Sequence, residues 1–244
     1  MRNLTLSRSG KCVSQAFAWL ILSSVTVAAQ PWPQEGNGTA SLPDGSTYTG
    51  PFVGGLFHGE GRLVWTNGDS YHGGFANGLM HGVGRQLWKA SGQSYEGGFR
   101  DGAFDGEGKL CFRDGCIEGS FVSGELQGFA KETMQSGDTY EGQYQNGVKS
   151  GRGIYTTSDG ATYVGEFANG LFHGKGRSRR PNGESYEGEF SDGAYHGVGT
   201  LRLPDGTLYT GDFEHGVAHG NGVLRYPDGQ KQHVKFQHGK LAER

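Results

Sequence analysis

The chain has 244 residues, of which 47 are glycine, and its hydrophobic share is only 34%. This composition excludes a bundle of membrane helices, which needs runs of about 20 apolar residues. It also disfavours a helical domain, because each interior glycine costs a helix about 1 kcal/mol. With 12% aromatic residues and a formal net charge of −3, the chain is not typical of disorder either, and a glycine-rich β protein remains.

The first 29 residues have the pattern of a secretory signal peptide. Three basic residues precede an apolar stretch, 16–29, which ends in small residues of the kind that signal peptidase recognises. This stretch is short for a spanning helix, so we favour cleavage after Ala29 over a retained anchor. We expect a periplasmic or secreted protein. Its net charge falls from −3 to −6 because Arg2, Arg8 and Lys11 are lost, which disfavours nucleic-acid binding.

One unit is repeated eight times over residues 48–231, with half units before and after. Each unit has Tyr-x-Gly-x-Phe, then x-x-Gly-x-x-x-Gly-x-Gly, then six residues and another Gly, as in YVGEFANGLFHGKGRSRRPNGES from residue 163. The units start at Tyr48, Tyr71, Tyr95, Ile117, Tyr140, Tyr163, Tyr186 and Tyr209. Such a period indicates a stack of identical supersecondary units.

Alternation predicts two strands in each unit. Counting the tyrosine as position 1, Tyr, Gly and Phe alternate at positions 1, 3 and 5, and a second strand runs from the glycines at positions 12 and 14 to position 18. Asn-Gly and Asp-Gly pairs between the strands supply the positive φ of tight turns. The glycine columns leave room for the aromatic rings to lie against bare backbone. We expect a meander of antiparallel hairpins.

The charges predict how neighbouring units pair. If position 16 faces position 1 of the next unit, position 15 faces position 2 and position 13 faces position 4. Four opposite-charge pairs then fall on the outward face: Lys131 with Glu141, Arg152 with Glu166, Lys175 with Glu189, and Arg177 with Glu187. Exposed pairs of this kind specify register more than stability.

These units resemble MORN repeats (membrane occupation and recognition nexus) over residues 36–239. The resemblance implies an all-β, elongated, single-layer antiparallel array of β-hairpins, a rod used for protein interaction, dimerisation or lipid contact. We therefore expect a signal peptide at 1–29, a short linker at 30–35, the repeat domain at 36–239 and a C-terminal tail at 240–244.

Catalytic, cofactor-binding and metal-ligating residues are not expected. The sequence has no Ser nucleophile elbow, no phosphate loop followed by a helix and no His-Glu-x-x-His motif. A column of histidines occupies position 11: His58, His81, His173, His196 and His219. Equivalent positions in neighbouring units lie about 10 Å apart, too far to ligate one metal ion. We interpret these histidines as residues that precede a turn glycine, with a pH-sensitive surface as the alternative.

Cys111 and Cys116 flank the turn at Asp114-Gly115, and an exported protein meets oxidising conditions. The register above places the two cysteines opposite each other, which suits a disulfide, whereas a tight turn at Asp114-Gly115 leaves them diagonal. An intramolecular bond, two free thiols and an intermolecular bond stay open.

Two sets of residues are candidate contacts. The first is a basic cluster, either an anionic contact or a solvated face: Lys175, Arg177, Arg179, Arg180, Arg202 and Arg225. The second lies at positions 9 and 10 and forms either an apolar partner surface or cover for a thin core: Leu56, Phe57, Leu79, Met80, Ala103, Phe104, Leu171, Phe172, Ala194 and Tyr195.

The two ends of the array differ. The last strand carries Lys231, His233 and Lys235, charges that discourage edge pairing, whereas residues 36–42 carry none. Our hypothesis is that any homodimer forms through this N-terminal edge. As a whole the sequence favours a non-enzymatic protein-interaction or scaffolding module with an unidentified protein partner. The alternatives are binding of anionic lipid headgroups and, through Trp65 and Trp88, of carbohydrate or cell wall.

Overall fold

The computed structural model describes residues 32–242 of the chain. The signal peptide expected at 1–29 lies outside the described residues. All 20 strands belong to one open antiparallel sheet, and residues 32–242 contain no helix. The all-β, single-layer hairpin array that the repeats predict is therefore confirmed.

The described residues divide into two compact units, 32–130 and 131–242, which we call the N-terminal and C-terminal units. The N-terminal unit contains β1 (Glu35–Ser41), β2 (Thr47–Val53), β3 (Leu56–Phe57), β4 (Gly59–Val64), β5 (Ser70–Ala76), β6 (Leu79–Trp88), β7 (Gln93–Arg100), β8 (Ala103–Phe112) and β9 (Gly115–Val122). Strand β10 (Glu125–Met134) spans the division between the units.

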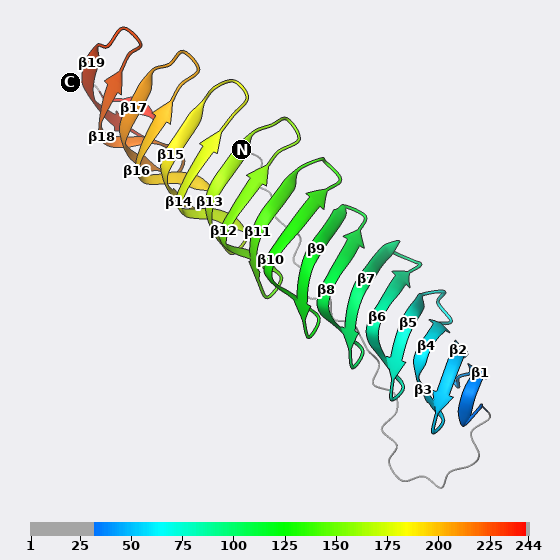
Figure 1. Cartoon of the computed structure of the whole chain (residues 1–244). Helices are drawn as coiled ribbons and strands as arrows, with labels where there is room; N and C mark the ends of the chain where they lie inside the picture. Colours follow the sequence, from blue (N-terminus) through cyan, green and yellow to red (C-terminus); the bar gives the residue numbers. More distant parts are fainter. Residues whose placement is uncertain (1–31, 243–244) are drawn as a thin grey trace. The chain divides into compact units, whose positions relative to one another are not determined.

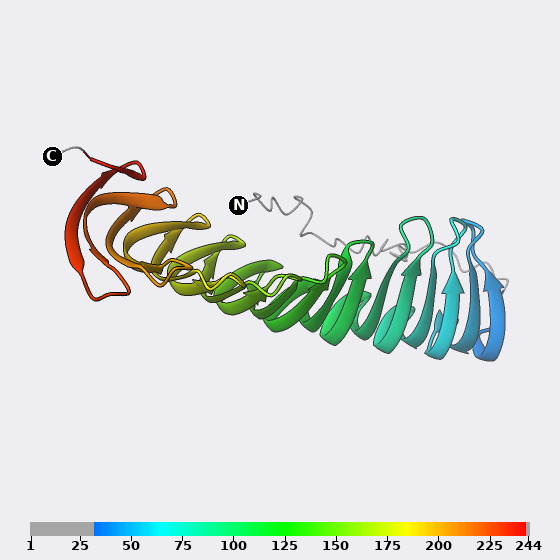
Figure 2. The ribbon, with the colours of Figure 1, turned by 90° about the horizontal axis from the view of Figure 1, so that it is seen from above.

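The C-terminal unit continues with the same alternation of strands and tight turns. It contains β11 (Thr139–Gln145), β12 (Val148–Thr156), β13 (Thr162–Ala168), β14 (Leu171–Arg179), β15 (Ser185–Ser191), β16 (Ala194–Arg202), β17 (Leu208–Glu214), β18 (Val217–Arg225), β19 (Lys231–Gln237) and β20 (Lys240–Leu241). Within each unit, strands that follow one another in the chain lie side by side, except that β3 and β4 lie end to end along the same edge of β2 (Figure 1). Strands β17 to β19 curve strongly, as Figure 2 shows.

Each repeat forms one hairpin, closed by the residues at positions 7 and 8. Both residues have positive φ, for example Asn169 at 52° and Gly170 at 81°, which is typical of a two-residue type I′ turn. At the other end, the Asp-Gly pair has positive φ only at the glycine, as at Gly206. There the Asp205 carboxylate accepts a hydrogen bond from the Thr207 amide, so the two Asp-Gly and Asn-Gly sites form different turns.

The tyrosine at position 1 lies against bare backbone, as the glycine columns predict. A Cβ on Gly165 or Gly176 would come within 2.6 Å of Tyr163 or of the facing glycine backbone. The Tyr163 hydroxyl donates to the Glu166 carbonyl at 2.8 Å, and the pairing of β13 with β14 shifts next to this contact, between Gly165 and Glu166. The ring is therefore fixed along the sheet at the point where the register is interrupted.

These rings form a thin core along one face of the sheet, which we call the tyrosine face (positions 1, 5, 10 and 16). Tyr163 and Tyr186 are almost fully buried, although the sheet has a single layer. Edge-to-face contacts join a tyrosine to the position-5 ring of its own repeat and of the next one, as in Tyr186 with Phe190 at 5.1 Å and with Phe213 at 4.9 Å. The rings thus connect neighbouring repeats within each unit.

Different residues cover the two ends of the array. At the N-terminal end, Pro33 lies over Gly38, where a full repeat would place its tyrosine ring, and the Trp32 indole donates to the Gly55 carbonyl. At the C-terminal end, Val234 replaces the position-3 glycine and is buried. Strand β1 begins at Glu35, the last residue of the expected linker, and the expected tail contains β20.

Candidate interaction surfaces

The face opposite the tyrosines carries the predicted charge register, and we call it the charged face (positions 2, 4, 13, 15 and 17). Arg152 lies opposite Glu166, and Lys175 lies opposite Glu189. Ion pairs join Lys131 Nζ to Glu141 Oε1 at 2.8 Å and Arg177 Nε to Glu187 Oε2 at 3.9 Å. Three of the predicted pairs lie opposite each other in the sheet, and the fourth, Lys131 with Glu141, forms an ion pair, so the predicted charge register is supported at all four places.

The six residues of the basic cluster fall into two groups. Arg177 pairs with Glu187, Arg180 Nη1 lies 2.7 Å from Glu184 Oε1, and Lys175 faces Glu189, so these three charges are largely balanced. The other three, which we call the arginine row, are exposed at position 17: Arg179, Arg202 and Arg225.

No acidic residue faces the arginine row in the sheet register. Arg179 lies opposite Thr162 and Ser185, and Arg202 lies opposite Ser185 and Leu208. Arg225 lies opposite Leu208 and Lys231. Among residues 32–242, these three arginines form no ion pair with a carboxylate.

The apolar candidates at position 10 are mainly part of the core, which favours cover for a thin core over a partner surface as the interpretation of this position. Phe104 and Tyr195 are buried, because their rings stack on Tyr95 and Tyr186 at 3.7 and 3.8 Å. Phe57 and Phe172 stack on the tyrosines of their own repeats at 3.8 Å and are half-buried, as is Met80. Position 10 supplies the cover that a single-layer sheet needs.

Position 9 behaves differently and projects beside the hairpin turns on the other face. In the N-terminal unit, Leu79 is 41% exposed and Leu56 is half-buried. In the C-terminal unit, Val148, Leu171 and Val217 are 42%, 38% and 40% exposed, with Ala194 in the same column. We call these four residues of the C-terminal unit the tip row.

The histidine column lies where the chain bends. His58, His81, His173 and His196 are exposed, and the glycine that follows each of them has positive φ. Their carbonyls can accept a second hydrogen bond from the tyrosine, as His196 does from Tyr186 at 3.2 Å. The prediction that these residues precede a turn glycine is consistent with this geometry.

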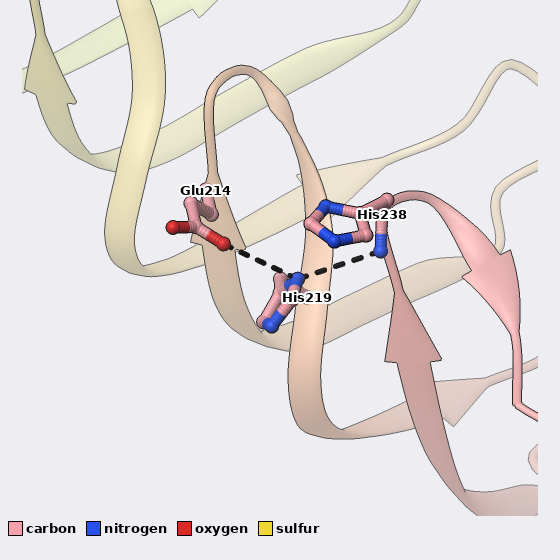
Figure 3. Close-up of side chains that lie close together, drawn as sticks. All are labelled: Glu214, His219 and His238. Atoms are coloured by element: carbon pink, nitrogen blue, oxygen red, sulfur yellow. Dashed lines mark hydrogen bonds and ion pairs between the residues drawn. The ribbon is translucent and has the colours of Figure 1, made fainter.

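One group of metal-ligating side chains is not predicted by the sequence pattern. Glu214, His219 and His238 each place a ligand atom within 4.8 Å of the others (Figure 3). The spacing of one column relates equivalent positions only, whereas the sheet brings position 11 of one repeat beside position 7 of the next. The available signal was the histidine at position 7, which occurs only at His215 and His238 in the repeats.

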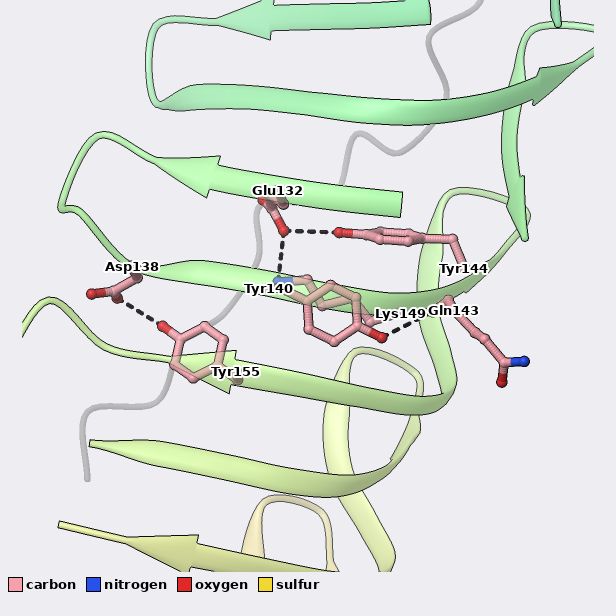
Figure 4. A network of polar contacts seen from close by, with 7 residues as sticks. All are labelled: Glu132, Asp138, Tyr140, Gln143, Tyr144, Lys149 and Tyr155. Atoms are coloured by element: carbon pink, nitrogen blue, oxygen red, sulfur yellow. Dashed lines mark hydrogen bonds and ion pairs between the residues drawn. The ribbon is translucent and has the colours of Figure 1, made fainter. Parts of the chain in front are cut away.

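A buried polar cluster is also not predicted by the sequence pattern. Lys149 occupies position 10, where other repeats stack a ring, and its side chain is 5% exposed. Its Nζ lies 2.7 Å from Glu132 Oε2 and 4.7 Å from the centre of the Tyr140 ring (Figure 4). Glu132 also accepts the Tyr144 hydroxyl at 2.9 Å. Burial and the neighbouring Glu132 charge raise the pKa of Tyr140 to about 12.

Cys111 and Cys116 form a disulfide in the structure. They lie directly opposite each other in the pairing of β8 with β9, with Leu110 opposite Ile117. The hairpin closes at Arg113 and Asp114, not at Asp114-Gly115, because Phe112 pairs with Gly115. This register is the one that continues from the neighbouring repeats.

Two shallow hollows, both open to solvent, lie on the charged face. One is lined by Arg62, Ser70, His72, Arg85 and Leu87. The other is lined by Arg177, Ser185, Glu187, Val198, Gly199, Thr200, Arg202 and Leu208. Trp65 and Trp88 are half-buried, and the Trp88 ring packs against Phe104 at 6.2 Å. Within residues 32–242 we find no helix that could cross a membrane.

The sequence profile of the MORN repeat matches eight consecutive segments: 48–70, 71–92, 95–117, 118–139, 140–162, 163–185, 186–208 and 209–231. These segments make up most of the chain, and each coincides with one hairpin of the structure. The protein is therefore a β-hairpin repeat protein. The chain belongs to the MORN repeat family. No curated relative matches the sequence.

Solved structures show only distant likeness. The TCP10 domain of CPAP from Danio rerio is 14% identical, with 84% of this chain and 98% of that chain covered and a TM-score of 0.46. The SAS-4 TCP domain of Drosophila melanogaster, solved with a proline-rich motif of Ana2, is 15% identical over 87% and 95%, with a TM-score of 0.29. At these scores neither structure supports an argument about the function of this chain.

Proposed function

We propose that this MORN-repeat chain is a non-enzymatic protein-interaction module that acts outside the cytoplasm. The tip row carries the proposal. Val148, Leu171 and Val217 lie on the first, second and fourth of four successive hairpins of the C-terminal unit, each about two-fifths exposed, and the third hairpin carries Ala194. Neighbouring hairpins repeat about every 10 Å, so the row suits an extended partner with regularly spaced apolar side chains.

The charges on the charged face favour a protein partner over a partner that is bound by charge alone. Its central ladder alternates in sign, as in Lys131 with Glu141 and Arg177 with Glu187, so most of its charge is internally balanced. Export is part of the proposal and rests on the pattern of residues 1–29. The Cys111–Cys116 disulfide is compatible with an oxidising compartment.

The test replaces tip-row side chains and measures cross-linked partner in the producing cell. After cross-linking, a partner protein should be recovered with the wild-type chain. The double variant Val148→Ser and Leu171→Ser should recover much less of this partner. The matched control is Ile154→Ser with Val198→Ser, two residues of the charged face that are 45% and 59% exposed. Equal loss with the control, or no loss with the tip-row variant, contradicts the proposal.

The second candidate function is contact with anionic lipid headgroups through the arginine row. The observation that favours it is the absence of facing carboxylates at these three positions within the described sheet. Each cation near an anionic surface contributes about 1 kcal/mol, and salt screens this attraction.

Vesicle sedimentation tests the lipid function. On anionic vesicles at low salt, binding of the full chain should disappear when Arg179, Arg202 and Arg225 are changed to Glu. A matched control changes Arg62, Arg85 and Lys109 to Glu and alters the net charge equally. If the wild type stays in the supernatant at low salt, or if the control loses binding to the same extent, the arginine row is not a headgroup site.

Self-association through β1 is an independent part of the proposal. In the described residues, β1 pairs only with β2, and residues 36–42 carry no charge. Deletion of residues 30–42 should convert any oligomer into a monomer, as measured by light scattering. A deletion variant that keeps the wild-type oligomeric mass contradicts this mode of association.

A further inference from the structure

Three side chains converge at the C-terminal end of the array. Glu214 lies at the end of β17, His219 lies in β18, and His238 lies in the turn between β19 and β20 (Figure 3). The Glu214 Oε2 atom is 3.3 Å from His219 Nδ1, and the two imidazole rings are 4.9 Å apart. His219 is half-buried, which limits the orientations of its ring.

The repeat explains why these residues meet only here. Position 7 has positive φ in every described hairpin, and the other repeats place Asn, Asp, Ser or Gly there. The last full repeat and the half unit after it instead place His215 and His238 at this position, both with positive φ. Histidine, like asparagine and aspartate, is enriched among the residues that adopt positive φ, so the turn is kept while an imidazole lies beside position 11 of the preceding repeat.

The geometry around His219 Nδ1 is that of a cation site. His219 Nδ1 accepts the His238 amide in a long hydrogen bond of 3.4 Å, which a metal ion bound to this lone pair would replace, and the Glu214 carboxylate points at the same nitrogen. Two acceptors 3.3 Å apart repel each other unless a proton or a metal ion lies between them. In tetrahedral zinc, ligand bonds of about 2.0–2.1 Å separate two ligands by about 3.3 Å.

We propose that Glu214, His219 and His238 bind a divalent transition-metal ion of the zinc class. A carboxylate and two imidazoles are ligands that Zn²⁺ accepts, and the fourth position is open to water or to a partner side chain. His215 Nε2 lies 3.9 Å from Glu214 Oε1, the carboxylate oxygen that does not face His219.

Other histidines of the array show what an ordinary pair looks like. His81 Nδ1 lies 3.9 Å from Asp101 Oδ1, which is the same position-11 to position-7 contact with only two potential ligands. Among residues 32–242, the group at the C-terminal end is the one in which three such residues come together. The pair of His81 and Asp101 therefore provides a matched control.

The test is titration of the untagged full chain with zinc chloride in a calorimeter. We expect saturable binding of one Zn²⁺ per chain. His238→Asn restores the residue type of Asn146 and Asn169 at position 7, so the turn is kept, and it should weaken binding at least about tenfold. Glu214→Ala, which matches Ala76 and Ala168 at position 6, should do the same, whereas the control His81→Ala should leave the affinity unchanged.

A second readout locates the metal. Zn²⁺ should protect His219 and His238, but not His81, from modification by diethyl pyrocarbonate, as measured by mass spectrometry of peptides. Absence of saturable binding to the wild type, or equal affinity of His238→Asn and wild type, would overturn the site. Equal protection of His81 would overturn it as well.

Discussion

At the residue scale, the glycines at positions 3 and 14 are constrained by space. A Cβ on Gly176 would lie 2.6 Å from Tyr163 Cε2 and Oη, a distance that side chains do not tolerate. Because the Tyr163 hydroxyl is also held by the Glu166 carbonyl, the ring cannot move away without losing a hydrogen bond. The sequence pattern predicted this contact correctly, because a glycine column beside a tyrosine column leaves a strip of bare backbone that the ring can cover.

The first prediction concerns this contact. Gly176→Ala should destabilise the chain by about 1–3 kcal/mol, because overpacking displaces a ring that is fixed on both sides. Val198→Ala, at an exposed position of the charged face, should change the stability by less than about 0.5 kcal/mol. Urea unfolding followed by circular dichroism measures both. An unchanged midpoint for Gly176→Ala would contradict the packing account.

The second prediction concerns the buried lysine. Lys149→Met leaves Glu132 uncompensated beside the core and should cost about 3–5 kcal/mol. The triple variant with Glu132→Leu and Tyr144→Phe restores the usual Leu and Phe of positions 16 and 5, and it should recover most of that loss. If the triple variant is as unstable as Lys149→Met, the loss of stability in Lys149→Met does not come from the broken ion pair, and the account is contradicted.

This buried cluster could not be predicted from the charges alone. From the sequence alone, a lysine at position 10 is predicted to be exposed to solvent. That position 10 is part of the core becomes evident only from the structure, in which Phe104 and Phe172 stack on the tyrosines of their repeats. For the same reason the sequence pattern groups positions 9 and 10 into one apolar surface, although they project from opposite faces.

At the element scale, the hairpin is the unit that the sequence specifies best. Strand order, the register of neighbouring repeats and the turn at positions 7 and 8 all follow from alternation and from Asn-Gly pairs. The contact of position 11 with position 7 of the next repeat was not predicted, because the histidines were compared only with the equivalent position of neighbouring repeats, whereas the pairing of Gly220 with Phe236 brings His219 close to His238. The meeting of His219 with His238 is the main example.

The third prediction concerns the β8–β9 hairpin. Its disulfide closes a short loop across strands that already pair at Leu110 and Ile117. Reduction should therefore cost about 2 kcal/mol from the entropy of a short loop, without unfolding the sheet. Thermal unfolding of the oxidised chain and of the double variant Cys111→Ser, Cys116→Ser measures the difference. Loss of the β-sheet signal in the variant at room temperature would contradict this prediction.

At the scale of the whole molecule, the tyrosine face links stability to alkaline pH. Burial raises the pKa of every tyrosine at position 1, of which Tyr186 reaches about 12. The unfolded chain ionises its tyrosines near pH 10, whereas the folded chain keeps them protonated. The raised pKa values therefore contribute full stability below pH 10, and this stability falls as the pH rises from 10 toward the folded values.

The fourth prediction follows from this linkage. When absorbance at 295 nm and the β-sheet signal are followed together above pH 10, most tyrosinate should appear in step with unfolding. The structural reason is that the core tyrosines cannot ionise while their rings lie against the sheet. A gradual titration centred near pH 10, with the sheet signal intact, would contradict the burial of the tyrosine face.

The central claim is that the tip row holds another protein, and site-specific photo-cross-linking tests it most directly. A photoreactive phenylalanine derivative at Leu171, in cells that produce the chain, should give discrete protein adducts. The same group at Thr200, on the charged face, should give few. Discrete adducts at Leu171 alone are the predicted result, and an absence of adducts at Leu171, or equal adducts at both positions, would contradict the claim.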